Sequence, residues 1–259
     1  MKSGDYYFKK AIYPQAIRYY EKYLAHSQDT QDKIPVWMAL ARSWAKLGNC
    51  SKSLEYYELT AQADPLGPRN KAIQNEIFTC SDFFPLEEQS HWEEVDSQTL
   101  GQNMFAVNDA QKQPGSYIVR RKIYAGKNSP RLVHEAIFIY SKEPGMVWER
   151  LAGQTPANEQ TLALRFPYEK GAFWTTKRQG RWVRRTITDK NIKIQVAAGR
   201  FDGCLEVMEE STQRGQETIQ ALSGSARIYD TYCPGIGRVK SMVGQGDRKE
   251  PHSELLLRK

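Results

Sequence analysis

The sequence predicts an α+β multidomain fold, in which an N-terminal α-helical region is followed by antiparallel β-rich domains that form a curled sheet or half-barrel. Early in the chain apolar residues recur at helical spacing, as at Ile17, Tyr20 and Leu24. Much later apolar and polar residues alternate, as around Leu162 and Leu164, which is typical of strands with one buried face. The 259 residues are long enough for about two domains.

An internal repeat marks the N-terminal region. The segment AIRYYE at 16–21 matches SLEYYE at 53–58, at an offset of 37 residues. In the second copy the spacing of aromatic, small and proline residues resembles the tetratricopeptide repeat, on Trp37, Leu40, Ala41, Trp44, Gly48, Ser53, Tyr57 and Pro65. The resemblance implies helical repeats over 1–85, with 68–80 as a capping helix. Because the first copy lacks its opening turn, we expect the chain to begin inside a longer array or after a leader.

The tetratricopeptide resemblance also implies a partner-binding groove made by the first helix of each repeat. The repeat's phase directs these residues into it: Asp5, Phe8, Lys9, Arg42, Ala45 and Lys46. Three cations there favour an acidic peptide or a C-terminal carboxylate. The alternative is an ordinary solvated face on a two-repeat spacer.

The same resemblance implies a disulfide in the helical region. Antiparallel packing would place the start of the 50–63 helix beside the end of the 68–80 helix, so that Cys50 and Cys80 become neighbours. We expect these two cysteines to be bonded, with two free thiols as the alternative.

A strand-rich connector module is predicted over 90–150. β-branched and aromatic runs at 104–107, 117–124 and 132–140 are separated by residues that favour turns. His91 and His134 are isolated from any nucleophile pattern, so we expect structural roles for both.

A third domain is predicted over 155–259. Three elements resemble a bacterial envelope domain of uncharacterised function: Phe166-Pro167 with Gly171 and Trp174, AAGRFDGCLEV at 197–207, and YCPGIGRVK at 232–240. The resemblance spans about 160–243 and implies that the strands carrying Cys204 and Cys233 lie close, which predicts a second disulfide. Two disulfides favour a periplasmic or other extracytoplasmic location, with membrane anchoring through a leader outside this chain as a further expectation.

Most of the formal net charge of +7 lies in the C-terminal region, where residues 151–259 carry a surplus of six positive charges. The densest group is a candidate anion-binding surface beside two tryptophans: Lys177, Arg178, Arg181, Arg184 and Arg185. Strand alternation divides these cations between two faces, so a solvated hairpin is the alternative. Acidic residues are mixed among the basic ones, and we do not expect nucleic-acid binding.

No arrangement of residues predicts catalytic, cofactor or metal chemistry, and we expect no enzyme activity. No apolar run approaches the roughly 18 residues of a membrane span. The leading hypothesis is a non-enzymatic adaptor or scaffold of the bacterial cell envelope that binds a protein partner or a larger envelope assembly. The alternative is a periplasmic carrier that holds lipid or another apolar ligand in the curled C-terminal sheet. The carrier hypothesis requires that the concave face is not filled by Trp174, Trp182, Ile194 and Phe201.

Overall fold

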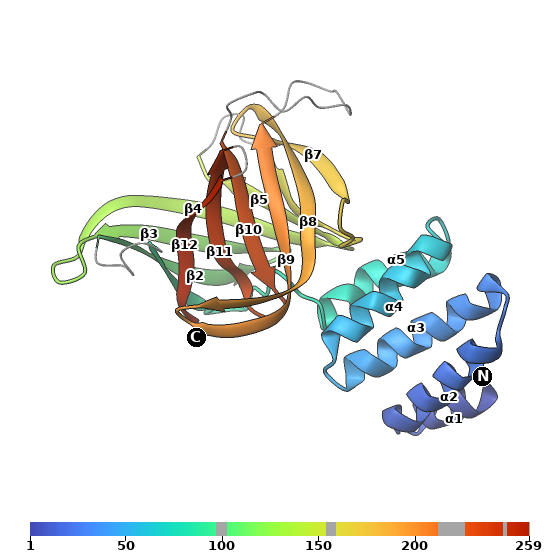
Figure 1. Cartoon of the computed structure of the whole chain (residues 1–259). Coiled ribbons are helices and arrows are strands. Elements are labelled where there is room, and N and C mark those ends of the chain that lie inside the picture. Colours follow the sequence, from blue (N-terminus) through green and yellow to red (C-terminus); the bar gives the residue numbers. More distant parts are fainter. Residues whose placement is uncertain (97–102, 154–158, 212–225, 246–247, 259) are drawn as a thin grey trace. The chain divides into compact units, whose positions relative to one another are not determined.

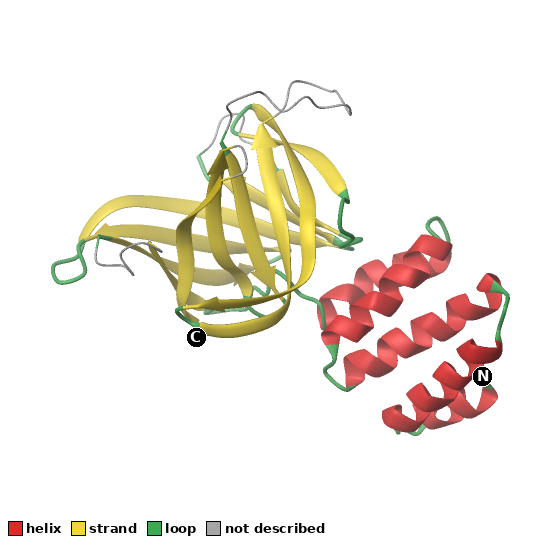
Figure 2. Ribbon diagram, viewed as in Figure 1, coloured by secondary structure: helices red, strands yellow, loops and turns green. Residues whose placement is uncertain are grey.

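The computed structural model describes residues 1–96, 103–153, 159–211, 226–245 and 248–258 (Figure 1). The chain divides into two units, Met1–Asp82 and Phe83–Lys259. The first unit is helical and the second consists of strands (Figure 2).

Unit 1 contains five α-helices followed by one 3₁₀ turn: α1 (Lys2–Lys9), α2 (Tyr13–His26), α3 (Thr30–Lys46), α4 (Cys50–Ala63), α5 (Pro68–Glu76) and Ile77–Thr79. The side chains of Asp29 and Asn49 cap α3 and α4 by accepting hydrogen bonds from backbone N–H groups in the first turn. The core between α2 and α3 is a cluster of buried apolar residues: Ala16, Ile17, Tyr20, Val36 and Leu40.

The identification of the chain as a tetratricopeptide repeat protein is wrong. The five helices in the described residues are short, the longest having 17 residues, and antiparallel β-strands make up more of the chain than helices do. The apolar spacing that suggested the repeat is not specific to this family, because any amphipathic helix must bury one face. Tyr20 and Tyr57 are indeed buried, but their burial specifies packed helices rather than this family.

Unit 2 is one antiparallel sheet of twelve strands: β1 (His91–Asp96), β2 (Met104–Gln113), β3 (Ser116–Ala125), β4 (Arg131–Glu143), β5 (Met146–Leu151), β6 (Thr161–Arg165), β7 (Phe173–Arg178), β8 (Arg181–Val196), β9 (Gly199–Ser211), β10 (Arg227–Cys233), β11 (Gly237–Gln245) and β12 (Arg248–Arg258). The strand order is β6-β5-β4-β3-β2-β1-β12-β11-β10-β9-β8-β7. Nearly every strand therefore pairs with its neighbours in sequence, and the β1–β12 pair joins the two halves.

Side chains connect the two edge strands, β6 and β7, where the curled sheet nearly closes on itself; we call this contact the seam. The Leu162 N–H donates to Thr176 Oγ1 at 2.9 Å, and the Trp174 Nε1–H donates to the Leu162 carbonyl at 2.9 Å. Thr161 Oγ1 donates to the Lys177 carbonyl at 2.8 Å. The buried Trp174 thus occupies the seam, where its ring and its N–H are both satisfied.

The predicted fold class and the separate β domain at 155–259 require correction. Strands of the predicted 90–150 connector and of the 155–259 domain lie in the same sheet, because β1 pairs with β12 in a register that matches Val95 with Glu254. Alternation indicates that a segment is a strand with one buried face, but it carries no information about a partner more than 150 residues away. The fold is mostly antiparallel β, with a few short helices.

Both predicted disulfides are present. Cys50 is bonded to Cys80 in unit 1, and Cys204 is bonded to Cys233 in unit 2. The second pair joins neighbouring strands β9 and β10 inside an apolar cluster that also contains Val196, Val239 and Leu255. Each unit therefore has its own covalent cross-link.

We expect the seam to depend on the Thr176 hydroxyl. In Thr176→Val the shape is kept, but the buried Leu162 N–H loses its acceptor, which costs about 1–3 kcal/mol of the free energy of unfolding. The matched control is Thr175→Val, one residue away on the exposed face, with an effect within about 0.5 kcal/mol. Chemical denaturation measures the free energy of unfolding of both variants. Equal losses in Thr176→Val and Thr175→Val would show that the hydrogen bond between Leu162 and Thr176 does not stabilise the fold.

Each disulfide is expected to stabilise its own unit. The sequence separations are 30 and 29 residues, so either loop closure contributes about 2–4 kcal/mol. Replacing Cys204 and Cys233 together by Ser should lower the unfolding transition of the β-sheet and leave that of the helices in place, and the Cys50 and Cys80 pair should do the reverse. Circular dichroism at helix and sheet wavelengths separates the two. Intact mass without reductant checks the pairing, with about four hydrogens fewer than the reduced chain.

Candidate functional site

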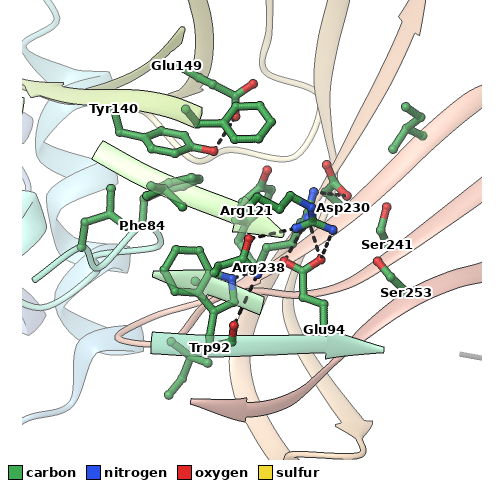
Figure 3. Close-up of a pocket in the computed structure, with 18 of the residues that line it drawn as sticks. Phe84, Trp92, Glu94, Arg121, Tyr140, Glu149, Asp230, Arg238, Ser241 and Ser253 are labelled. Atoms are coloured by element: carbon green, nitrogen blue, oxygen red, sulfur yellow. Dashed lines mark hydrogen bonds and ion pairs between the residues drawn. The ribbon is translucent and has the colours of Figure 1, made fainter. Parts of the chain in front are cut away.

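A cavity of about 300 Å³ lies inside the curled sheet of unit 2. Its walls come from most of the strands of the sheet and from the segment 84–86 that precedes β1. Figure 3 shows Phe84, Trp92 and Tyr140 toward one side and Glu94 and Asp230 toward the other, with Glu149 beside Tyr140. The residues that matter most for its chemistry are Phe84, Trp92, Glu94, Arg121, Phe138, Tyr140, Glu149, Arg178, Asp230, Tyr232 and Arg238.

The aromatic side is built around Phe84. Its ring centroid lies 4.8 Å from that of Tyr140 and 6.0 Å from that of Tyr232. Phe138 lies further along β4, with its ring centroid 6.3 Å from that of Tyr140. These rings offer flat apolar surfaces within contact range of one another.

Glu94 is the centre of the charged side. Its carboxylate accepts hydrogen bonds from Arg121 Nη2 at 3.0 Å and from Arg238 Nη2 at 2.8 and 3.1 Å. Trp92 Nε1 donates to the same carboxylate at 3.3 Å. Arg121 also donates to Asn108 Oδ1 at 3.2 Å, and Arg238 Nη1 lies 3.8 Å from Asp230 Oδ1. One buried anion therefore lies between two guanidinium groups.

Strand geometry brings these side chains together. Trp92 and Glu94 are two residues apart on β1 and so face the same side of the sheet. Asn108 and Arg121 are directly opposed in the β2–β3 register. Arg238 follows the tight turn between β10 and β11, in which Gly235 has φ +72°, a conformation that favours glycine.

Electrostatics keep Glu94 ionised. Its burial alone would raise the pKa, but the charges and hydrogen bonds of Arg238 and Arg121 outweigh this effect and lower the pKa to about 2. The charge of Glu94 in turn holds the pKa of Arg238 well above its ordinary value. The cluster is therefore fully charged at neutral pH.

A second ionic group borders the cavity at β7–β9. Glu209 pairs with Arg185 Nη2 at 2.6 Å and with Arg178 Nη1 at 2.7 Å. Burial favours a higher pKa for Glu209, but the two arginines lower it on balance. Nearby, the Tyr140 hydroxyl donates to Glu149 Oε2 at 2.8 Å.

The five cations of the predicted anion-binding surface lie in different environments. Arg178 and Arg185 face inward and pair with Glu209. On the outer face, Arg184 lies 4.1 Å from the Phe173 ring centroid and Lys177 lies 5.4 Å from that of Trp182, as cation–π pairs. Arg181 is exposed at the hairpin turn. The structure thus divides these five residues between the two faces of the sheet and brings Arg178 among them into the cavity lining.

The residues predicted for the helical groove are also divided. Asp5 accepts a hydrogen bond from the Tyr20 hydroxyl at 2.8 Å, and Arg42 pairs with Glu76 at 2.6 Å. Phe8 packs on the core between α2 and α3, whereas Lys9 and Lys46 are exposed. Asp5 and Arg42 therefore make contacts within unit 1.

A carrier would be excluded if four residues filled the concave face of the sheet. None of them lines the cavity: Trp174, Trp182, Ile194 and Phe201. Trp174 lies in the seam and Trp182 lies under Lys177 on the outer face. Ile194 and Phe201 pack against the apolar cluster around the Cys204–Cys233 disulfide. The space beside the aromatic side is thus open.

Glu94, Arg121 and Arg238 were not predicted as site residues from the sequence. Glu94 could have been found from the sequence. It is two residues from Trp92 in a predicted strand, so the two side chains share a face, and a buried Trp92 implies a buried carboxylate. For the two arginines no local signal existed, since the strands that carry them pair with Glu94 only through the long-range sheet order. In the described part of the chain no group of His, Cys, Asp and Glu is placed to hold a metal ion. Among these residues, none of the helices has the length and apolar character needed to cross a membrane.

Comparisons with known proteins give little beyond this geometry. No family model matches the chain, and no curated protein matches it. Two solved structures resemble it, each covering 68% of this chain and 98% of its own. One is a candidate exported protein with a YmcC-like fold from Bacteroides fragilis NCTC 9343, at 15% identity and a TM-score of 0.46. The other is a candidate lipoprotein from Parabacteroides distasonis ATCC 8503, at 14% identity and a TM-score of 0.42.

The ion pairs of Glu94 should make stability depend on pH. A carboxylate whose pKa is lower in the folded state stabilises above its unfolded pKa, and this contribution disappears as the pH falls from about 5 to about 2. We expect Glu94→Gln to lower the free energy of unfolding by about 3 kcal/mol at pH 7 and to differ little from the wild type near pH 2.

Urea denaturation at a series of pH values measures this difference. The control is Glu135→Gln, which removes an exposed ion pair with Arg120 and should change stability by less than about 1 kcal/mol. A Glu94→Gln penalty that stays constant from pH 7 to pH 2 would contradict the assigned role.

Proposed function

We propose that this chain is an extracytoplasmic binding protein, a carrier, that holds a small molecule with an apolar body inside the curled sheet of unit 2. The observation that carries the proposal is the open cavity of about 300 Å³ with Phe84, Phe138 and Tyr140 on one side. Concave sites lined by aromatic rings with a few convergent polar groups are the usual form of small-molecule sites.

The size of the cavity limits its ligand. Its volume is at the lower end of the range for small-molecule pockets, about 300–1,000 Å³. A compact aromatic molecule of up to about three rings, or a short chain, fits such a space. This favours a carrier for a small amphipathic compound over one that encloses a whole membrane lipid.

The disulfides support an extracytoplasmic location. Pairs such as Cys50–Cys80 and Cys204–Cys233 form and persist in oxidising compartments. Within the extracytoplasmic compartments, our prediction is the periplasm, with or without membrane anchoring.

The carrier proposal takes precedence over the adaptor hypothesis. The adaptor depended on a tetratricopeptide groove, and two of its residues, Asp5 and Arg42, bond within unit 1. The absence of enzyme activity remains a prediction. In support of binding rather than catalysis, Glu94 is held by two arginines with its pKa lowered, which makes it a poor proton acceptor at neutral pH.

Filling the cavity should abolish ligand uptake. Ile228 lines the cavity and is partly exposed, so Ile228→Trp adds a ring where a ligand would lie. The control is Thr175→Trp, on the exposed outer face of β7. With the neutral fluorescent probe N-phenyl-1-naphthylamine, we expect saturable binding by the wild type and by the control and at least tenfold weaker binding by Ile228→Trp. Native mass spectrometry of the protein from envelope extracts gives the mass of a retained ligand. No saturable uptake by the wild type would contradict the carrier proposal.

A further inference from the structure

We propose that the cavity selects a small organic anion, with its acidic group against Arg121, Arg178 and Arg238 and its apolar body on the aromatic side. This inference rests on the carrier function proposed above and names the chemical class of the ligand. It follows from which charged atoms the cavity exposes, rather than from the net charge of its lining.

Three arginines and three carboxylates line the cavity, so its formal charges cancel, but the exposure of these groups differs. The arginine side chains remain partly accessible, at 21% for Arg121, 37% for Arg178 and 33% for Arg238. The carboxylates that pair with them are covered, at 5% for Glu94, 11% for Glu209 and 14% for Asp230. A ligand that enters therefore meets these guanidinium groups before it meets Glu94, Glu209 or Asp230.

The arginines retain donors for such a ligand. A guanidinium group has five N–H donors in a planar fork. Among the described residues, Arg238 uses Nη2 for its hydrogen bonds to Glu94, and its Nη1 is 3.8 Å from Asp230, beyond hydrogen-bond distance. Arg178 donates from Nη1 to Glu209. Each arginine is thus held in place by a buried carboxylate while part of its fork remains available to an acidic group.

The covered carboxylates disfavour a cation. To reach Glu94, a ligand ammonium group would have to displace two arginines and the Trp92 N–H. Glu149 already accepts a hydrogen bond from the Tyr140 hydroxyl. Asp230 Oδ1 is buried and forms no hydrogen bond with the described residues, but Arg238 Nη1 lies beside it, toward the same space. A positively charged ligand would therefore meet repulsion first.

The aromatic side of the cavity determines the apolar part of the ligand. Phe84, Tyr140 and Tyr232 form a set of tilted rings at centroid distances of 4.8 and 6.0 Å. Trp92 lies at the boundary, because it lines the cavity and its Nε1–H points at Glu94. Figure 3 shows Phe84, Trp92 and Tyr140 around the same space as Arg121 and Arg238. A flat hydrophobic body joined to an acidic group matches this division.

Three probes that share one body and differ in charge test the inference. They are 2-naphthoate, 2-naphthamide and 2-naphthylmethylammonium, titrated into the full chain by calorimetry at low salt. We expect 2-naphthoate to bind at least tenfold more tightly than the amide, and the ammonium compound to bind most weakly. Equal or tighter binding of the amide or the ammonium compound overturns the inference. It is also overturned if none of the three binds while N-phenyl-1-naphthylamine does.

Variants of the arginines assign the effect to the site. Arg178→Gln leaves Glu209 paired with the buried Arg185, so we expect the fold to be kept and naphthoate binding to weaken about tenfold, with amide binding changed less than about twofold. Arg238→Gln should act in the same direction, with thermal unfolding as a check on folding. The control is Arg120→Gln, on the opposite, exposed face of β3, which should change neither. An equal loss for both probes in Arg178→Gln would overturn the assignment, and loss of N-phenyl-1-naphthylamine uptake by the wild type would instead contradict the carrier proposal.

Discussion

The interior of unit 2 depends on one buried carboxylate between two guanidinium groups. Glu94 on β1, Arg121 on β3 and Arg238 on β11 come from strands on both sides of the β1–β12 pair that joins the halves of the sheet. If the charge of Glu94 is removed, Arg121 and Arg238 both lose this carboxylate as a partner, which is costly. The same contact therefore links the two halves of the sheet and places a charged group beside the aromatic side of the cavity.

This arrangement is a compromise between stability and specificity. Replacing a buried ion cluster by apolar residues of similar volume is often neutral or stabilising. A sheet selected for stability alone would fill its interior with apolar side chains, as the sheet does in the apolar cluster around Cys204–Cys233. Keeping open space beside Arg238 and Arg178 lowers the packing density and leaves charges that are only partly covered, which is reasonable if the space is used by a ligand.

Local features of the fold were predictable and its connections were not. The helical spacing around Tyr20 and the alternation around Leu162 identify helices and strands, and both cysteine pairs followed from resemblances of which the tetratricopeptide one is wrong. The single sheet depends on the pairing of β1 with β12, for which neither strand carries a local signal. The site was missed for the same reason, because Glu94 and Arg238 are separated by 144 residues and meet only once that pairing exists.

The side-chain closure between β6 and β7 has a consequence for association. The outermost strands of a sheet present unpaired backbone groups that can recruit a strand from another molecule. Here the two ends of the sheet face each other, and Thr176 and Trp174 occupy backbone groups of Leu162 that would otherwise be open to such an addition. Loss of these side chains would leave the Leu162 N–H without its acceptor at the edge of the sheet, and this edge would then be less protected against the addition of a strand from another molecule.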